Sequence, residues 1–167
     1  MKKVIIILFG ISLLFILTKK EADILIPSNA IRFRVIANSN SFEDQMLKKE
    51  IKNNVEKDIY NFIGTINNKD EAKDMINNNM NKIEEILNRY NVKYKIDYGY
   101  NYFPTKNYKG VLYKAGNYES LVITLGEGMG DNFWCVLFPP LCLLDEKTEN
   151  TSEVEYKLYV KKLLKMF

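Results

Sequence analysis

The chain has 167 residues, of which 47% are hydrophobic and 27% are charged, and this composition suits one folded domain preceded by a leader. Its net charge of +3 is small and no basic cluster is interleaved with aromatic residues, so nothing indicates a nucleic-acid-binding surface. The absence of histidine excludes Ser-His-Asp triads, Cys-His dyads and histidine zinc sites, and two cysteines cannot complete a structural zinc site. We therefore expect no metal and no cofactor.

Residues 1–23 have the pattern of a leader. Lys2 and Lys3 precede a largely apolar run over residues 4–17, as in a secretory signal peptide. As a helix this run would span roughly 21 Å, short of the ~30 Å hydrocarbon core of a bilayer. A retained anchor would therefore need the bilayer to thin or the flanking lysines to snorkel. Both alternatives stay open: residues 1–23 are a signal peptide, or an N-terminal anchor that contacts the membrane. In either case we expect residues 24–167 to form a single extracytoplasmic domain.

One alternating segment and two amphipathic segments follow the leader. Apolar residues at every second position predict a half-buried strand over residues 31–37. Ser41 is a good helix N-cap, and an apolar stripe at helical spacing predicts a first helix over residues 42–63. A second stripe predicts a helix over residues 70–90, although the three asparagines at 77–79 are poor helix formers that packing must hold in place.

The second half of the chain completes the expected fold. Alternation predicts strands over residues 92–102, 109–114 and 118–125, and an amphipathic pattern predicts a last helix over residues 154–167. A strand-helix-helix-strand unit reverses direction at each step, so its two strands should be antiparallel. We therefore predict an α+β, two-layer domain: a mostly antiparallel sheet of about four strands, two long helices on one face, and a C-terminal helix.

The most distinctive stretch covers residues 126–142, which hold three glycines at alternate positions, the only tryptophan and both cysteines. We predict a glycine loop, then a short helical segment that carries Trp134 and Cys135, then a proline stop that returns Cys142 toward it. Outside the cytoplasm Cys135 and Cys142 can form a disulfide, and the alternative is a pair of buried free thiols.

The sequence carries little that indicates catalysis. The glycines from Gly126 to Gly130 follow a strand, as in a phosphate-binding loop, but they lack the Gly-Lys-Ser/Thr end and the spacing of a dinucleotide site. Glu119, Glu127 and Asp131 are close in sequence, so an exported hydrolase that acts on cell wall is the alternative function. Aromatic anchors in stiff loops are typical of partner recognition, and we predict an extracytoplasmic interaction protein rather than an enzyme.

Several segments resemble the stage II sporulation protein R family of endospore-forming bacteria. The resemblance extends over nearly the whole part after the leader. The segments that carry it are residues 30–39, 44–48, 103–106, 115–118 and 126–142. The last of them is the most specific. Two positions depart from the family pattern: Phe133 stands where a second tryptophan is usual, and Lys114 where proline commonly occurs.

The resemblance implies a developmental signal. Such proteins are made in the forespore and exported into the space between the two sporulating compartments. There they activate a membrane-embedded aspartic protease of the mother cell, which matures the sigma factor pro-sigma-E. The resemblance thus implies that the partner is the extracytoplasmic part of this protease, and that the protein is not itself an enzyme. From the residues themselves we expect a partner-facing surface, the alternative being support of the fold, at Arg32, Arg34, Asn38, Asp131, Asn132 and Trp134.

Overall fold

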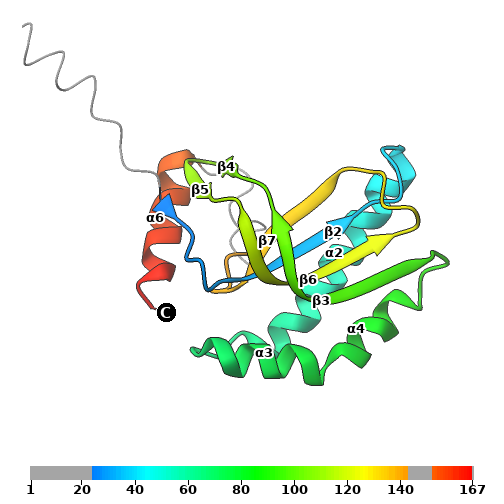
Figure 1. The fold of residues 1–167 in the computed structure, drawn as a ribbon, viewed down its shortest axis with the longest axis horizontal. Coiled ribbons are helices and arrows are strands. Elements are labelled where there is room, and N and C mark those ends of the chain that lie inside the picture. Colours follow the sequence, from blue (N-terminus) through cyan, green and yellow to red (C-terminus); the bar gives the residue numbers. More distant parts are fainter. Residues whose placement is uncertain (1–23, 143–151, 167) are drawn as a thin grey trace, which may run out of the picture.

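A computed structural model describes residues 24–142 and 152–166 (Figure 1). The leader predicted for residues 1–23 lies outside the described residues. Within the described ranges, no helix has both the length and the apolar character that crossing a bilayer requires. In chain order the elements are β1 (Ile24–Leu25), β2 (Ile31–Ile36), α2 (Phe42–Ile63), α3 (Lys69–Asn78), α4 (Met80–Leu87), β3 (Tyr94–Phe103), β4 (Lys106–Tyr108), β5 (Val111–Tyr113), β6 (Gly116–Leu125), β7 (Asn132–Phe138) and α6 (Glu153–Leu164).

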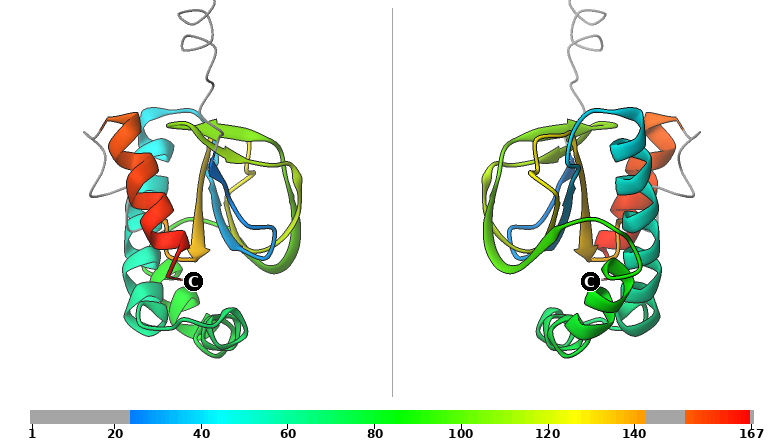
Figure 2. Two further views of the ribbon diagram at one scale, coloured as in Figure 1. Left: turned by 90° about the vertical axis from the view of Figure 1, so that its left-hand side faces the viewer. Right: turned by 90° about the vertical axis from the view of Figure 1, so that its right-hand side faces the viewer.

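The main sheet has four strands in the order β3-β6-β2-β7. β2 runs parallel to β6 and antiparallel to β7, and β3 runs antiparallel to β6. Helices α2, α3 and α4 lie together on one face of this sheet (Figures 1 and 2). These observations confirm the predicted α+β class, with a mostly antiparallel sheet and the helices on one face.

The core between sheet and helices combines two periodicities, alternate residues on β2 and every third or fourth residue on α2. The buried side chains that meet there include Ile31, Phe33 and Val35 from β2, and Ile51, Val55, Ile59 and Ile63 from α2. The hydroxyl of Ser41 accepts a hydrogen bond from the backbone N–H of Asp44 at 3.1 Å, which caps the first turn of α2. The helix predicted over residues 42–63 is confirmed at both ends.

The helix predicted over residues 70–90 is instead two helices, α3 and α4, with a break at Asn79. The side-chain amide of Asn79 donates a hydrogen bond to the carbonyl of Met75 at 2.8 Å, so it competes with the helical backbone. Both halves still reach the core, through Ile76 in α3 and Ile83 in α4. The expectation that packing would carry one continuous helix through the asparagines is therefore wrong.

The short helix predicted around Trp134 and Cys135 is also wrong, because these residues lie in strand β7 at the edge of the sheet. Aromatic and branched side chains suit a pleated, half-buried strand. Successive side chains alternate between the two faces: Phe133, Cys135 and Leu137 pack with the helices, whereas Val136 packs in a second core. The glycines do form the expected loop, between β6 and β7, and Gly126 and Gly128 have the positive φ values, 54° and 65°, that favour glycine.

A second, smaller sheet in the order β1-β5-β4 lies over one end of the other face (Figure 2). The strand predicted over residues 109–114 is part of this sheet, as a hairpin of β4 and β5 that turns at Lys109 and Gly110. Helix α6 begins with a capping box between Ser152 and Glu155. It contributes Tyr156 and Val160 to the second core, which also contains Ile26, Ala30, Val111, Val136 and Leu141.

Candidate docking cleft

A cleft of about 790 Å³ opens between the first half of α2, strand β7 and the β4–β5 hairpin. Figure 2 shows these elements around the free edge of the main sheet. The cleft is lined by six aromatic side chains, namely Phe42, Phe103, Tyr108, Tyr113, Phe133 and Trp134. It is also lined by the cationic side chains of Arg32, Lys48, Lys49, Lys52 and Lys106, and no aspartate or glutamate is among its lining residues. An aromatic and positively charged surface of this kind is suited to binding a partner.

Trp134 is half-buried in this cleft and is held from several sides. The ring of Phe103 meets it edge to face, with 5.2 Å between the ring centroids. The guanidinium of Arg34 lies 5.0 Å from the indole centroid, and the amine of Lys106 lies 5.8 Å from it. The indole is therefore positioned by the fold before any partner arrives, which lowers the entropic cost of binding.

Arg32 is almost fully buried, with 2% of its surface exposed, among aromatic rings on the same face of the sheet. Its guanidinium carbon lies 3.5 Å from the ring centroid of Tyr118 and 5.4 Å from that of Phe103. Burial lowers the pKa of Arg32, and the nearby Tyr118 partly offsets this effect. Burial also lowers the pKa of Arg34. Both arginines thus support the cleft from beneath, and Arg32 also lines it.

The lysines of the cleft differ in whether they already have a hydrogen-bond or ion-pair partner within the chain. Lys52 is buried and forms an ion pair with Glu56 at 2.6 Å, and its amine lies 4.6 Å from the ring centroid of Phe133. Burial lowers the pKa of Lys48, an effect that the charge of Asp131 partly offsets. Lys49 is exposed and has no hydrogen-bond or ion-pair partner among the described residues. The charge of Lys49 is therefore available to a ligand.

Asn38 and Asp131 belong to a loop cluster at one end of the cleft rather than to its floor. The side-chain oxygen of Asn38 accepts a hydrogen bond from the N–H of Glu127 at 3.0 Å, and its amide donates to Asp44 at 2.9 Å. The amine of Lys48 donates to the backbone carbonyl of Asp131 at 3.0 Å. These hydrogen bonds tie the glycine loop to the start of α2. The hydrogen bonds from Ser39 and Asn38 also lower the pKa of Asp44.

Cys135 and Cys142 are joined by a disulfide with 5.4 Å between their Cα atoms, a normal separation for such a bond. It connects the buried side of β7 to the second residue after the two prolines. A carboxylate oxygen of Glu56 lies 3.3 Å from the sulfur of Cys135. The disulfide therefore borders the cleft next to the Lys52–Glu56 ion pair.

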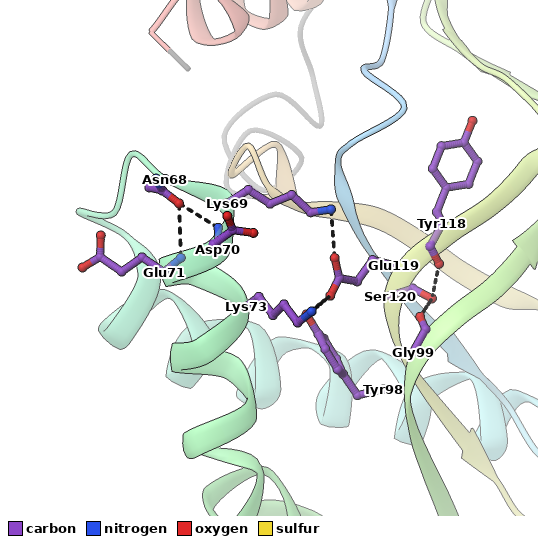
Figure 3. Close-up of polar contacts among 10 residues, drawn as sticks. All are labelled: Asn68, Lys69, Asp70, Glu71, Lys73, Tyr98, Gly99, Tyr118, Glu119 and Ser120. Carbon is purple, nitrogen blue, oxygen red and sulfur yellow. Dashed lines mark hydrogen bonds and ion pairs between the residues drawn. The ribbon is translucent and has the colours of Figure 1, made fainter.

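The three carboxylates that suggested a hydrolase, Glu119, Glu127 and Asp131, do not form a shared site. Glu119 is buried on the helix side of β6, where Lys69 pairs with it at 2.8 Å and Lys73 at 3.4 Å (Figure 3). Burial alone would raise the pKa of Glu119, but the hydrogen bonds and charges of the two lysines outweigh it, so the pKa lies below its usual value. Six strand residues separate Glu119 from the end of β6, roughly 20 Å, and both Glu127 and Asp131 lie beyond that end. The structure thus gives Glu119 a structural contact with α3.

The structure brings only part of the predicted surface together. Arg32, Asn132 and Trp134 line the cleft, Arg34 lies beneath Trp134, and Asn38 and Asp131 lie in the loop cluster. Sequence reasoning missed both walls of the cleft, which come from α2 and the hairpin. A signal was available in Phe42 and Met46, which are 76% and 50% exposed, because neither belongs to the apolar stripe of α2.

The fold defines an α+β domain with an aromatic, positively charged cleft at the edge of its main sheet. The chain belongs to the stage II sporulation protein R family, whose sequence model matches residues 27–148. The protein of Bacillus subtilis (strain 168) named "Stage II sporulation protein R" is 39% identical to it over 181 aligned residues, which cover 97% of this chain and 81% of the relative. No solved structure matches the chain. This membership assigns the chain to a family of sporulation proteins.

Proposed function

We propose that this protein is an exported developmental signal that activates a membrane-embedded aspartic protease and so leads to maturation of pro-sigma-E. The observation that carries the proposal is the family match over residues 27–148. The apolar, lysine-preceded start of the sequence supports export into the space between the two sporulating compartments. The protein acts there by binding, without catalysing a reaction itself.

The cleft is the surface through which the signal acts. Trp134 and Asn132 contact the extracytoplasmic part of the protease, and Arg32 and Arg34 hold the indole in place. Asn38 and Asp131 act indirectly, since they fix the loop that leads into β7. A ligand activates an enzyme only by binding its active state more tightly than its inactive state. The cleft therefore prefers the active form of the protease.

Reconstitution in a non-sporulating host tests this function. The full-length chain is co-expressed with the protease and its sigma-factor substrate, and cleavage of the substrate is measured. We expect cleavage that depends on the signal and is strongly reduced by Trp134→Ala, but not by Tyr100→Ala, a matched aromatic control that is 73% exposed and does not line the cleft. Absence of cleavage with both partners present at normal levels would contradict the proposal.

The same assay separates signalling from hydrolysis. The conservative variants Glu127→Gln and Asp131→Asn remove the exposed carboxylates of the glycine loop while keeping their size. A signal that acts by binding keeps activity in both variants, because neither carboxylate is part of the cleft lining. Asp131 holds the loop through its backbone carbonyl and N–H, and Asp131→Asn keeps both groups. Loss of sigma-factor cleavage together with measurable release of cell-wall fragments by the purified chain would instead support the exported hydrolase.

A further inference from the structure

The floor of the cleft is the unpaired edge of a β-sheet. β7 is the last strand of the main sheet and pairs only with β2. At the start of β7 the N–H of Ala37 donates to the carbonyl of Asp131 at 3.5 Å, so the backbone groups of Asp131 face β2. Since backbone groups alternate along an antiparallel strand, those of Asn132 and Trp134 face away from the sheet and toward the cleft.

The open part of this edge is short and well defined. The carbonyl of Val136, which alternation also directs outward, already accepts a hydrogen bond from the N–H of Leu141 at 3.1 Å. No described residue outside the sheet hydrogen-bonds the backbone N–H or carbonyl of Asn132 or Trp134. Strand addition is therefore available along residues 132–134 and stops at Val136.

The side chains of β7 give the two sides of this edge different walls. Phe133 faces α2, where the amine of Lys52 lies over its ring. Trp134 faces the hairpin side, where Lys106 lies near the indole. An extended peptide placed beside β7 would alternate its side chains between these two walls. The edge of the sheet and both walls thus form one groove for a single extended segment.

The positive charge of the cleft lining indicates which kind of segment binds there. The lining carries Arg32 and the lysines at 48, 49, 52 and 106 without any carboxylate. The side-chain oxygen of Asn132 is buried and accepts no hydrogen bond from a described residue, so it is an acceptor without its donor. A second copy of this chain is a poor occupant, since its own β7 carries no acidic residue and pairing two such edges would bring two sets of lysines together.

We propose that the cleft binds an extended, acidic segment of a partner protein, which adds to the main sheet as a further strand beside residues 132–134 of β7. Backbone hydrogen bonds to Asn132 and Trp134 hold the segment, and its carboxylates pair with Lys49 and Lys106 at the rim. The inference deepens the proposed function, and it rests on that function only in taking the partner to be a protein.

Peptide binding to the full-length chain tests the proposal. The probe is a short capped peptide in which pairs of glutamates alternate with pairs of valines, so that carboxylates face both walls. The readouts are calorimetry and the fluorescence of Trp134, the only tryptophan of the chain. We expect saturable binding and a changed emission. A peptide with lysine in place of glutamate should bind at least about tenfold more weakly, because its charges face the lysines of the cleft. Equal binding of the two peptides overturns the charge assignment.

A backbone-modified peptide separates strand addition from simple charge attraction. Methylation of alternate backbone nitrogens removes donors while keeping every carboxylate. We expect one of the two alternate methylation patterns to weaken binding at least about tenfold and the other to weaken it less, because only one set of N–H groups faces β7. Equal affinity of both methylated peptides and the parent overturns strand addition.

Charge-reversal variants locate the site. Lys49→Glu combined with Lys106→Glu should weaken binding of the acidic peptide at least about tenfold and should strengthen binding of the lysine peptide. The matched control, Lys57→Glu with Lys161→Glu, makes the same change in net charge at exposed positions outside the cleft. Concentration-dependent dimerisation that blocks binding of the acidic peptide, and that Lys49→Glu with Lys106→Glu changes, would identify a second copy as the occupant and would overturn the proposal.

The outcomes of the binding and cleavage assays are distinguishable. Sigma-factor cleavage without acidic-peptide binding overturns this inference alone. Peptide binding without cleavage overturns the protease-activating function and leaves the groove assignment standing.

Discussion

The two faces of the main sheet bury different chemistry, and neighbouring residues of β2 show the difference. Phe33 is buried in the apolar core against α2, whereas Arg32, one residue earlier, is a charged residue buried among aromatic rings on the opposite face. The helix face gains its stability from apolar burial. The opposite face orders an indole beside a cleft, and side-chain atoms of Arg32, Arg34 and Asn132 there have no hydrogen-bond partner among the described residues. The apolar core against the helices and the proposed binding surface thus lie on different faces.

The largest expected effect comes from opening the helix face. Phe33→Ala removes a fully buried ring from the contact between β2 and α2, and should lower the free energy of unfolding by about 3–5 kcal/mol. Urea denaturation followed by circular dichroism measures this change. Phe33→Leu is the control and should recover more than half of the loss. A cost below about 1 kcal/mol for the alanine variant would contradict the assignment of this face as the stabilising one.

Breaking the disulfide tests how strongly β7 depends on its covalent link. Replacing Cys135 and Cys142 together by alanine opens a short loop, which should cost about 2–3 kcal/mol of unfolding free energy. Unfolding of the wild-type chain with and without a reducing agent gives the same comparison without a mutation. If the reductant also destabilises the double variant, the effect does not come from this bond.

Removing the buried charge of Arg32 should lower the free energy of unfolding less than Phe33→Ala does. Arg32→Met keeps much of the volume among Phe103 and Tyr118 but removes the cation–π contacts, for an expected loss of about 1–2 kcal/mol. The emission of Trp134 should also change, since the rings that position it repack. Arg32→Lys is the control that keeps a charge. An unchanged emission in the methionine variant would argue against coupling between Arg32 and the indole.

Glu119 is a buried charged residue on the helix face, and its contribution to stability depends on pH. Its pKa is lower in the folded state than the ordinary value of 4.5, so its stabilising effect is present at neutral pH and disappears as the pH falls below 4.5 through the folded pKa. Glu119→Gln should therefore cost about 1–2 kcal/mol at pH 7 and flatten the loss of stability at acid pH. Denaturation midpoints between pH 6 and pH 3 check this, with Glu85→Gln, at an exposed site on α4, as control. Parallel pH profiles for Glu119→Gln and wild type would contradict it.

The smallest effect is expected where β3 extends beyond the helices. Tyr102 is 62% exposed although it points to the helix side of the sheet, so Tyr102→Thr should change the free energy of unfolding by less than about 0.5 kcal/mol. Thermal denaturation measures this. A larger loss would mean that the helix face continues to the end of the strand and would weaken the division between the two faces.

The sequence predicts correctly those elements whose type depends only on residues within or next to the element. The alternation in β2 and the capped stripe of α2 are set by neighbouring residues, and both were predicted correctly. β7 was predicted as a helix because the glycines before it indicate a loop and the prolines after it indicate a stop. The strand β2, whose pairing makes it a strand, lies far away in the chain. The parallel contact between β2 and β6 has the same origin, since neither sequence specifies its neighbour in the sheet.

The candidate site was predictable only where its residues lie close together in sequence. Trp134 and Asn132 belong to the distinctive stretch over residues 126–142, and both line the cleft. Lys49 and Lys106 are ordinary surface lysines in sequence and become part of one surface only when α2 and the hairpin meet β7. Asn38 was predicted to be partner-facing, but its side chain holds the glycine loop and does not line the cleft.

The position of β2 has a consequence for how the domain is completed as the chain emerges. β2 lies in the middle of the main sheet, and both strands that flank it begin at or after Gly116. A polypeptide that leaves a ribosome or a translocation channel from its N-terminus therefore exposes a central strand with no neighbours until most of the chain has followed. The main sheet therefore stays incomplete until both β6 and β7 have emerged.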